Sequence, residues 1–169
     1  MIQRTLTIIK PDAVRARVQG HIIQRLLDDG FNILAMRQVR LSQRNAEEFY
    51  AVHRERPFYG ELVQFMTSGP VVVACLEKDE AVAALRNVMG PTDSCKAPKD
   101  TIRGRFGSNI QNNAIHGSDS PDNAVKEIAF FFAASDLAAA ERDGSNAPAH
   151  GQKPKPQPAT NRPPRLKER

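Results

Sequence analysis

The sequence predicts an α+β protein with the ferredoxin-like βαββαβ order, in which helices cover a four-stranded antiparallel sheet. Apolar, β-branched runs at 4–10 and 70–77 are typical of strands in the middle of a sheet. Stretches with helical spacing follow each of them, and a further strand-like run closes the pattern. Strands and helices therefore alternate as two similar halves of one sandwich.

The first half begins with the run RTLTIIK at 4–10, which is rich in β-branched residues and stops before Pro11. A helix is expected over 20–29, because apolar residues recur on one face and Gly30 suits the position after a helix. Residues 31–41 predict the second strand.

Two helices are expected between the halves of the sandwich. Ser42 is a suitable N-cap for a helix that runs to about His53, and a shorter helix is expected from Gly60 to about Thr67. The run at 70–77 then predicts the third strand, which is apolar enough to be central.

The second half continues with a helix over 80–89, for which Asp79 can act as the cap. Residues 91–115 have little periodicity, and long loops inside domains are usually functional. Ser120 and the proline after it predict the start of a short helix. The run EIAFFF at 127–132 predicts the fourth strand.

The composition indicates a soluble globular protein and excludes several classes. Of the 169 residues, 40% are hydrophobic and 25% charged, and no apolar run approaches the roughly 20 residues of a membrane helix. The N-terminus lacks the apolar segment of a signal peptide. Cysteine is confined to Cys75 and Cys95, which favours a reducing compartment, so we expect a cytoplasmic protein without a membrane partner.

The C-terminal residues 138–169 differ in composition from the rest of the chain. They hold six of the 12 prolines and seven of the 24 Lys and Arg residues, against three of the 19 acidic residues. Such a segment buries too little apolar surface to offset its ordering entropy. We therefore expect one domain over 1–137 and a flexible, basic, proline-rich tail over 138–169.

Cationic and hydroxyl side chains collect in the predicted loops. Lys10 follows the first strand, Arg86 lies near the end of a helix, and the long loop contains Thr92 and Arg103. Guanidinium groups and a lysine without a dense acidic cluster suit a chain of phosphates. Because no glycine-rich phosphate loop is present, side chains would have to hold these phosphates.

His116 is the candidate nucleophile beside these cations. A neutral imidazole attacks phosphorus through one nitrogen when a carboxylate fixes the other, and Glu127 lies beyond one short predicted helix. Ser118 is close enough to assist either group. A lone histidine in a loop is more often a solvated residue, so this pattern by itself leaves both interpretations open.

Five sequence blocks carry a resemblance to a known family. The segment NAIHGSDS at 113–120 resembles the active-site signature of the nucleoside diphosphate kinases. The other blocks match that family in the same order and extend the resemblance over about 1–137; they are TLTIIKPDAV at 5–14, EFYAVHRERPFYGELVQFMTSGPVV at 48–72, RNVMGPTD at 86–93 and TIRGRFG at 101–107.

The resemblance implies a phosphotransferase that acts through His116. This residue is expected to take the γ-phosphate of a nucleoside triphosphate as phosphohistidine and to pass it to a nucleoside diphosphate. Glu127 and Ser118 would orient the ring, with Lys10 and Tyr50 beside it. The implied nucleotide contacts are Arg86, Thr92, Arg103 and His53 to phosphates, Lys10 and Asn113 to ribose, and Phe58 and Ile110 to the base.

The same resemblance implies a cofactor and an assembly. Mg²⁺ is expected, held mainly by nucleotide phosphates and without dedicated protein ligands. Broad base and sugar tolerance would let the enzyme balance NTP and dNTP pools. A homo-tetramer or homo-hexamer built from dimers is also expected. The chain departs from the usual family pattern at Lys99, Asp100 and Arg105.

Two other functions remain as alternatives. A nucleic-acid-binding ferredoxin-like domain would display aromatic residues on an exposed strand, but the usual RNA-recognition pattern is absent and the excess charge lies in 138–169. Weak nucleic-acid binding by that tail is compatible with its charge. A catalytically inactive nucleotide-binding scaffold is the second alternative, and the presence of His116 and Glu127 argues against it.

Overall fold

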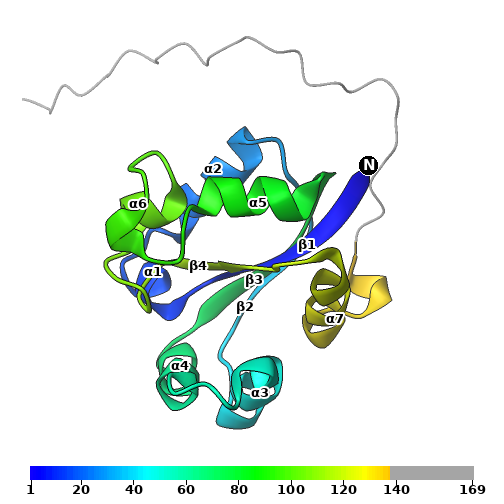
Figure 1. Cartoon of the computed structure of the whole chain (residues 1–169). Coiled ribbons are helices and arrows are strands. Elements are labelled where there is room, and N and C mark those ends of the chain that lie inside the picture. The colour runs from blue at the N-terminus through cyan, green and yellow to red at the C-terminus, as the bar shows by residue number, and fades with distance from the viewer. Residues whose placement is uncertain (138–169) are drawn as a thin grey trace, which may run out of the picture.

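The sheet at the centre of the molecule is antiparallel throughout, with the strand order β2-β3-β1-β4. The computed structural model describes residues 1–137, so the predicted tail at 138–169 lies outside the described residues. The strands are β1 (Ile2–Ile9), β2 (Asn32–Val39), β3 (Val71–Asp79) and β4 (Ile115–Gly117). This order confirms the predicted ferredoxin-like sandwich (Figure 1).

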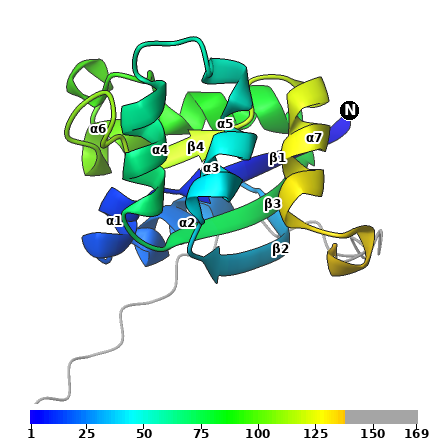
Figure 2. The same cartoon turned by 90° about the horizontal axis from the view of Figure 1, so that it is seen from below.

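Helices cover both faces of this sheet. The α-helices are α1 (Pro11–Arg15), α2 (Gln19–Asp28), α3 (Gln43–Phe49), α4 (Tyr59–Thr67), α5 (Ala81–Met89), α6 (Ile102–Phe106) and α7 (Pro121–Phe131). Short 3₁₀ turns are η1 (Ala51–His53), η2 (Ser94–Lys96) and η3 (Ala134–Asp136). Helices α2, α5 and α6 lie on one side, whereas α3, α4 and α7 cross the other side (Figures 1 and 2).

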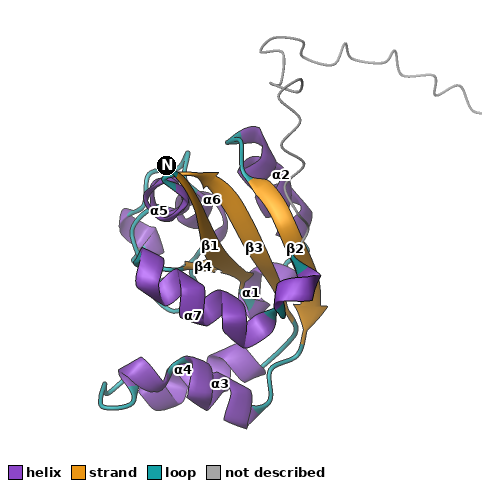
Figure 3. Ribbon diagram, turned by 90° about the vertical axis from the view of Figure 1, so that its right-hand side faces the viewer, coloured by secondary structure: helices purple, strands orange, loops and turns teal. Residues whose placement is uncertain are grey.

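Each face of the sheet has its own apolar core because successive strand residues point to opposite faces. In β1, Leu6 and Ile8 pack into the core below α3, α4 and α7, whereas Ile9 packs into the core below α2 and α5. Seen from the side, the sheet separates the two helical layers (Figure 3). The strands are therefore anchored on both faces and give the loops at their ends fixed positions.

The predicted fourth strand at 127–132 is wrong. This segment belongs almost entirely to α7, where Ala124, Ile128 and Phe131 share a buried face at helical spacing. Ser120 caps the helix as predicted, because its Oγ accepts the Asn123 N–H at 3.2 Å. The apolar run imitates a strand locally, but the cap and the spacing that precedes it determine a helix.

The fourth strand is instead β4, a strand of three residues at the end of the predicted loop at 91–115. It pairs with Thr7–Ile9 of β1. A strand of three residues is too short to produce a detectable alternation of apolar and polar residues. The predicted loop at 91–115 itself contains η2 and α6, each of one turn or little more.

The predicted helix cap at Asp79 is also wrong. Asp79 is the last residue of β3, and its carboxylate accepts a hydrogen bond from the N-terminal amino group. Glu80 occupies the cap position with a left-handed backbone (φ 50°) and makes no side-chain cap. The remaining predicted helices are present, including the one capped by Ser42, whose Oγ accepts the Asn45 N–H at 3.1 Å.

Candidate active site

His116 lies in the middle of β4, at the edge of the sheet. It is opposite Ile8, and its carbonyl oxygen accepts a hydrogen bond from Thr7 Oγ1 at 2.8 Å. About 20% of its side chain is exposed. The backbone of His116 is therefore held by the sheet, while its ring remains accessible to a ligand.

The Glu127 carboxylate holds one nitrogen of the His116 ring. His116 Nε2 lies 3.2 Å from both carboxylate oxygens, and Ser118 Oγ donates to Glu127 Oε2 at 2.6 Å. The hydroxyl of Ser118 also accepts the Leu6 N–H at 3.2 Å, which ties this group to β1. Because a carboxylate only accepts, Nε2 carries a proton in this arrangement, and in the neutral ring Nδ1 then keeps its lone pair.

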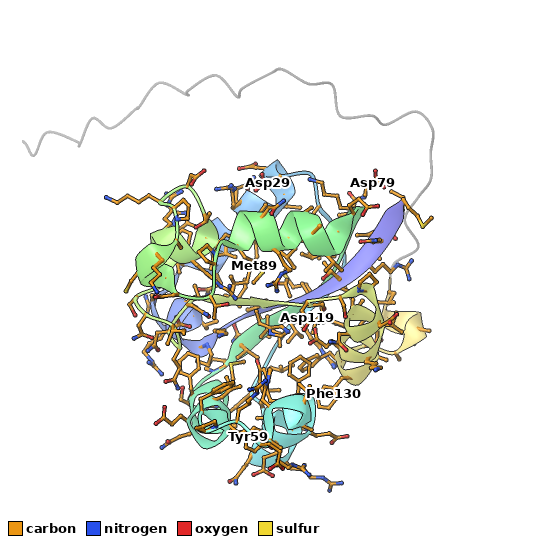
Figure 4. The ribbon with its side chains drawn as sticks, in the orientation of Figure 1. Asp29, Tyr59, Asp79, Met89, Asp119 and Phe130 are labelled. Carbon is orange, nitrogen blue, oxygen red and sulfur yellow. The ribbon has the colours of Figure 1, made fainter. Side chains whose placement is uncertain are left out.

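Aromatic rings enclose the other sides of His116. The Phe49 and Tyr50 ring centroids lie 5.5 Å and 6.0 Å from that of His116, both in edge-to-face geometry. Phe130 on α7 (Figure 4) contacts Phe49 in turn, at 5.4 Å. The Tyr50 hydroxyl is buried, has no hydrogen-bond partner within residues 1–137, and has a pKa raised by burial. It is a protonated donor that lacks an acceptor.

Two buried cations, Lys10 and Arg103, lie close to one another near this group. Each is 7% exposed, and neither forms an ion pair with a carboxylate of the described chain. Burial, followed by the charge of Arg103, lowers the pKa of Lys10 from 10.5 to about 8. Burial, followed by the charge of Arg86, lowers the pKa of Arg103 to about 10. The charge of Asp12 offsets the Lys10 charge only in part, so the two cations favour a polyanionic ligand.

Arg103 also joins the segments around the site. Its two terminal nitrogens donate to the carbonyl oxygens of Gly90 and Ile115, both at 3.0 Å. Its Nε is buried without a partner in the part of the chain that the structure describes. The side chain thus connects α6 with the end of α5 and with β4, and keeps one donor free.

Asn113 is a second junction. Its Oδ1 accepts from Lys10 Nζ at 2.6 Å, and its Nδ2 donates to the carbonyl oxygens of Thr92 and Ile110, both at 3.0 Å. Both amide protons are therefore used in holding the loop. Oδ1 retains a lone pair that can accept a hydrogen bond from a ligand hydroxyl.

Comparison with known proteins decides what this arrangement belongs to. The family model described as nucleoside diphosphate kinase matches residues 3–137. The chain belongs to the nucleoside diphosphate kinase family. It is accordingly a phosphotransferase that converts ATP and a nucleoside diphosphate into ADP and a nucleoside triphosphate.

Nucleoside diphosphate kinases of several organisms are similar to this chain. A nucleoside diphosphate kinase of Helicobacter pylori (strain Shi470) is 56% identical over 137 residues, which are 81% of this chain and all of that protein. The Aquifex aeolicus enzyme has a TM-score of 0.80 and 46% identity over 82% of this chain and all of its own. A Halobacterium salinarum kinase, solved in complex with CDP, has a TM-score of 0.81 and 38% identity over 86% of this chain and 97% of its own.

The remaining predicted nucleotide contacts of the kinase lie at its surface. Phe58 and Ile110 are 49% and 64% exposed. His53 lies between the buried and exposed aromatic rings, 6.4 Å from Tyr50 and 5.6 Å from Phe58 by ring centroids. The exposed Arg86 lies on the last turn of α5. Burial and then the Arg86 charge lower the pKa of Arg103, and the Asn123 hydrogen bond, with a smaller contribution from the Arg86 charge, lowers the pKa of Asp119, so the Arg86 charge lies beside the site. Asp119 lies between β4 and α7 (Figure 4).

Sequence reasoning missed two contributors to the kinase site. Phe49 contacts the His116 ring, and Asp12 accepts the Ala114 N–H at 3.0 Å through Oδ2. No periodicity or motif geometry in the sequence indicates either contact, because both join segments far apart in the chain. Of the departures from the family pattern, Arg105 is exposed and its guanidinium lies 5.2 Å from the Phe106 ring centre.

Proposed function

We propose that the enzyme works by a ping-pong mechanism, with a phosphohistidine formed at Nδ1 of His116. The observation that supports this proposal is the contact of His116 Nε2 with the Glu127 carboxylate, 3.2 Å from each oxygen. Two buried cations, Lys10 and Arg103, lie beside this pair and form no ion pair within residues 1–137. This arrangement provides a neutral nucleophile and a place for a triphosphate.

In the first half-reaction, the Nδ1 lone pair attacks the γ-phosphorus and the bond between that phosphorus and the β,γ-bridging oxygen breaks. The nucleoside diphosphate leaves with the electron pair of that bond. Nε2 keeps its proton, and the Glu127 carboxylate stabilises the positive charge that develops on the ring. In the second half-reaction, a terminal oxygen of another nucleoside diphosphate attacks the phosphohistidine and restores the neutral imidazole.

The phosphates would occupy the cationic part of the site. Arg103 Nε and the Tyr50 hydroxyl, both buried and unpartnered in the described structure, can donate to phosphate oxygens. Arg86, Thr92 and His53 would complete the phosphate contacts from the surface. Catalysis then consists mainly of positioning and of charge stabilisation at the transferred group.

Ribose and base would bind farther out. Lys10 and Asn113, already joined by a hydrogen bond of 2.6 Å, would contact the ribose hydroxyls. Phe58 and Ile110 would cover the two faces of the base, and their exposure leaves the base edges free of buried polar contacts. Stacking of this kind accepts any base, so the enzyme would serve the NTP and dNTP pools broadly.

A divalent ion, which we propose to be Mg²⁺, would enter with the nucleotide. Within residues 1–137 no three His, Cys, Asp or Glu side chains converge on a common metal position. Because Lys10 and Arg103 would repel a free dication, we expect the ion to arrive on the nucleotide and to take its ligands from phosphate oxygens and water, and no protein ligand is assigned. When bound, it would neutralise phosphate charge and align the triphosphate.

The cellular context is also part of the proposal. We propose a cytoplasmic homo-oligomer, a tetramer or hexamer assembled from dimers. No helix within residues 1–137 has the length and apolar character of a membrane span. Any nucleic-acid binding is proposed to be weak and confined to the basic segment 138–169, and its test is whether deleting these residues abolishes salt-sensitive binding of DNA or RNA.

The mechanism is tested by trapping the intermediate. The protein is incubated with γ-labelled ATP and Mg²⁺, and the label is expected on an acid-labile, base-stable phosphohistidine that GDP or dCDP discharges. His116→Ala should remain unlabelled, whereas the control His150→Ala, outside the described residues, should label normally. Labelling of His116→Ala would contradict the assignment of the nucleophile.

A further inference from the structure

A strained turn immediately precedes the strand that carries His116. Ala114 has a φ of +68°, and the Ile115 N–H donates to the Asn113 carbonyl across it at 2.8 Å. Residues other than glycine rarely adopt this backbone region, and they persist there only when their surroundings hold them. Ala114 is completely buried, so its backbone groups need partners within the protein.

Those partners come from the segment that follows β1. The Lys10 N–H donates to the Ala114 carbonyl at 2.9 Å, and Asp12 Oδ2 accepts the Ala114 N–H at 3.0 Å. Lys10 Nζ also donates to Asn113 Oδ1 at 2.6 Å. The chain just after β1 therefore holds both polar backbone groups of the strained residue and the side chain before it.

The Asp12 carboxylate has no other hydrogen-bonded role within residues 1–137. Its Oδ1 is buried and without a partner there, and the residue lies in the first turn of α1, where the preceding Pro11 fixes the backbone. The one hydrogen bond that the Asp12 carboxylate makes in the described structure therefore goes to the strained amide just before the strand that carries His116.

We propose that Asp12 is a positioning residue for phosphoryl transfer, because it holds the Ala114 turn and thereby sets the place of His116 relative to Lys10. The inference rests on the proposed role of His116. Strand β4 has only three residues, so the turn before it is a main constraint on the position of the ring. Displacements near 1 Å reduce the rates of such reactions by about 100-fold.

A competing explanation is that Asp12 acts through its charge. Its carboxylate opposes the lowering of the Lys10 pKa, so removing it would also weaken the lysine as a cation. The two explanations differ at Ala114. Glycine adopts positive φ without strain, so Ala114→Gly would relieve the strain of the turn, although it would restore neither the acceptor for the buried N–H nor the negative charge.

The experiment is a single-turnover measurement of His116 labelling by γ-labelled ATP and Mg²⁺ in a rapid-quench instrument. The proteins are wild type, Asp12→Ala, Asp12→Asn, Ala114→Gly and the double variant Asp12→Ala/Ala114→Gly. Asp136→Asn is the matched control, because the Asp136 carboxylate also accepts a backbone N–H, that of Ala133 at 2.8 Å, in an exposed turn. Thermal melts of every protein separate loss of rate from loss of fold.

At saturating ATP, Asp12→Ala is expected to label about 10- to 100-fold more slowly than wild type, with a smaller change in the ATP concentration that gives half the maximal rate. Asp12→Asn keeps an acceptor oxygen and should lose about threefold to tenfold. The double variant should recover at least fivefold over Asp12→Ala, and Asp136→Asn should match wild type. If Asp12→Ala does not fold, the same rescue is measured in Asp12→Asn.

Three results would overturn the inference in distinguishable ways. If folded Asp12→Ala is labelled at the wild-type rate, the carboxylate does not position His116. A slow double variant with no rescue would assign the effect to charge on Lys10. Absence of label from wild type itself would overturn the proposed function, and the inference with it.

Discussion

The cationic side chains at the two ends of β1 differ in whether a carboxylate forms an ion pair with them. Near its start, the side chain of Arg4 is 45% exposed and pairs with the mostly buried Glu77 at 3.1 Å. Just beyond its end, Lys10 is buried beside Arg103, and neither has a carboxylate partner in residues 1–137. The first end stabilises the apo fold, whereas the second holds two cations whose charge the nearby Asp12 carboxylate offsets only in part, so that a bound anion would compensate the rest.

The largest effect is expected from removing charge at the second end. Lys10→Met should reduce kcat/KM by about 100-fold or more, because the ammonium faces both the phosphates and the ribose in the proposed complex. It should also stabilise the apo protein by about 1–3 kcal/mol, because a desolvated ammonium with a pKa of about 8 is removed. Steady-state kinetics and urea unfolding measure the two effects.

Arg4→Met is the matched change at the first end. It leaves the buried Glu77 carboxylate without its ion pair, so the free energy of unfolding should fall by about 1–2 kcal/mol. The activity should stay within about twofold of wild type. Loss of activity without loss of stability in this variant would remove the distinction between the two ends.

The pH dependence sharpens the same distinction. The pKa of Lys10 is about 8 in the folded protein and 10.5 without perturbation, so the unfolded chain binds this proton more tightly. The Lys10 contribution to the free energy of unfolding therefore increases as pH rises from about 8 toward 10.5. Over the same range kcat/KM should fall, because the neutral amine no longer attracts phosphate.

The two pH profiles are measured by urea unfolding and by initial rates, each in wild type and in Lys10→Met. The variant should lack the increase in unfolding free energy assigned to Lys10, and its residual activity should lack the corresponding inflection near pH 8. Identical profiles in the two proteins would assign the titration to another group.

Ser118→Ala is expected to reduce activity less than Lys10→Met does. The substitution removes the 2.6 Å hydrogen bond to Glu127 and leaves the Leu6 N–H without its acceptor. Because Glu127 still reaches His116, the rate of phosphohistidine formation should decrease only about threefold to tenfold, and the stability should fall by about 1–2 kcal/mol. Single-turnover labelling and urea unfolding measure both, and an unchanged rate would show that Ser118 does not orient the carboxylate.

The fold was largely predictable from local sequence because its central strands are long and apolar. β1 and β3 are visible as β-branched runs, and Ser42 and Ser120 mark helix starts that the structure contains. The exceptions have one cause. The apolar end of α7 and the three residues of β4 cannot be assigned from a short window, because tertiary pairing decides which segment completes the sheet.

The candidate site likewise contains residues that the sequence indicates and contacts that only the folded structure reveals. His116 and Lys10 belong to recognisable sequence blocks, Glu127 follows the last block by seven residues, and the structure brings His116 and Glu127 within 3.2 Å of each other. By contrast, the left-handed backbone of Ala114 and its bond to Asp12 span 102 positions of sequence and involve a backbone amide. A residue's type does not reveal such contacts, because they form only when the chain folds.

The incompletely compensated charge at the end of β1 is tested most directly by titrating Lys10 itself. In protein with isotopically labelled lysine side chains and no ligand, NMR should show a lysine signal that titrates with a pKa of about 8. Its absence from Lys10→Met spectra would assign this signal to Lys10. Binding of a nucleoside diphosphate with Mg²⁺ should raise that pKa by about one unit or more, because phosphate favours the charged amine. An unperturbed value near 10.5 in the free protein, unchanged by the nucleotide, would contradict the account.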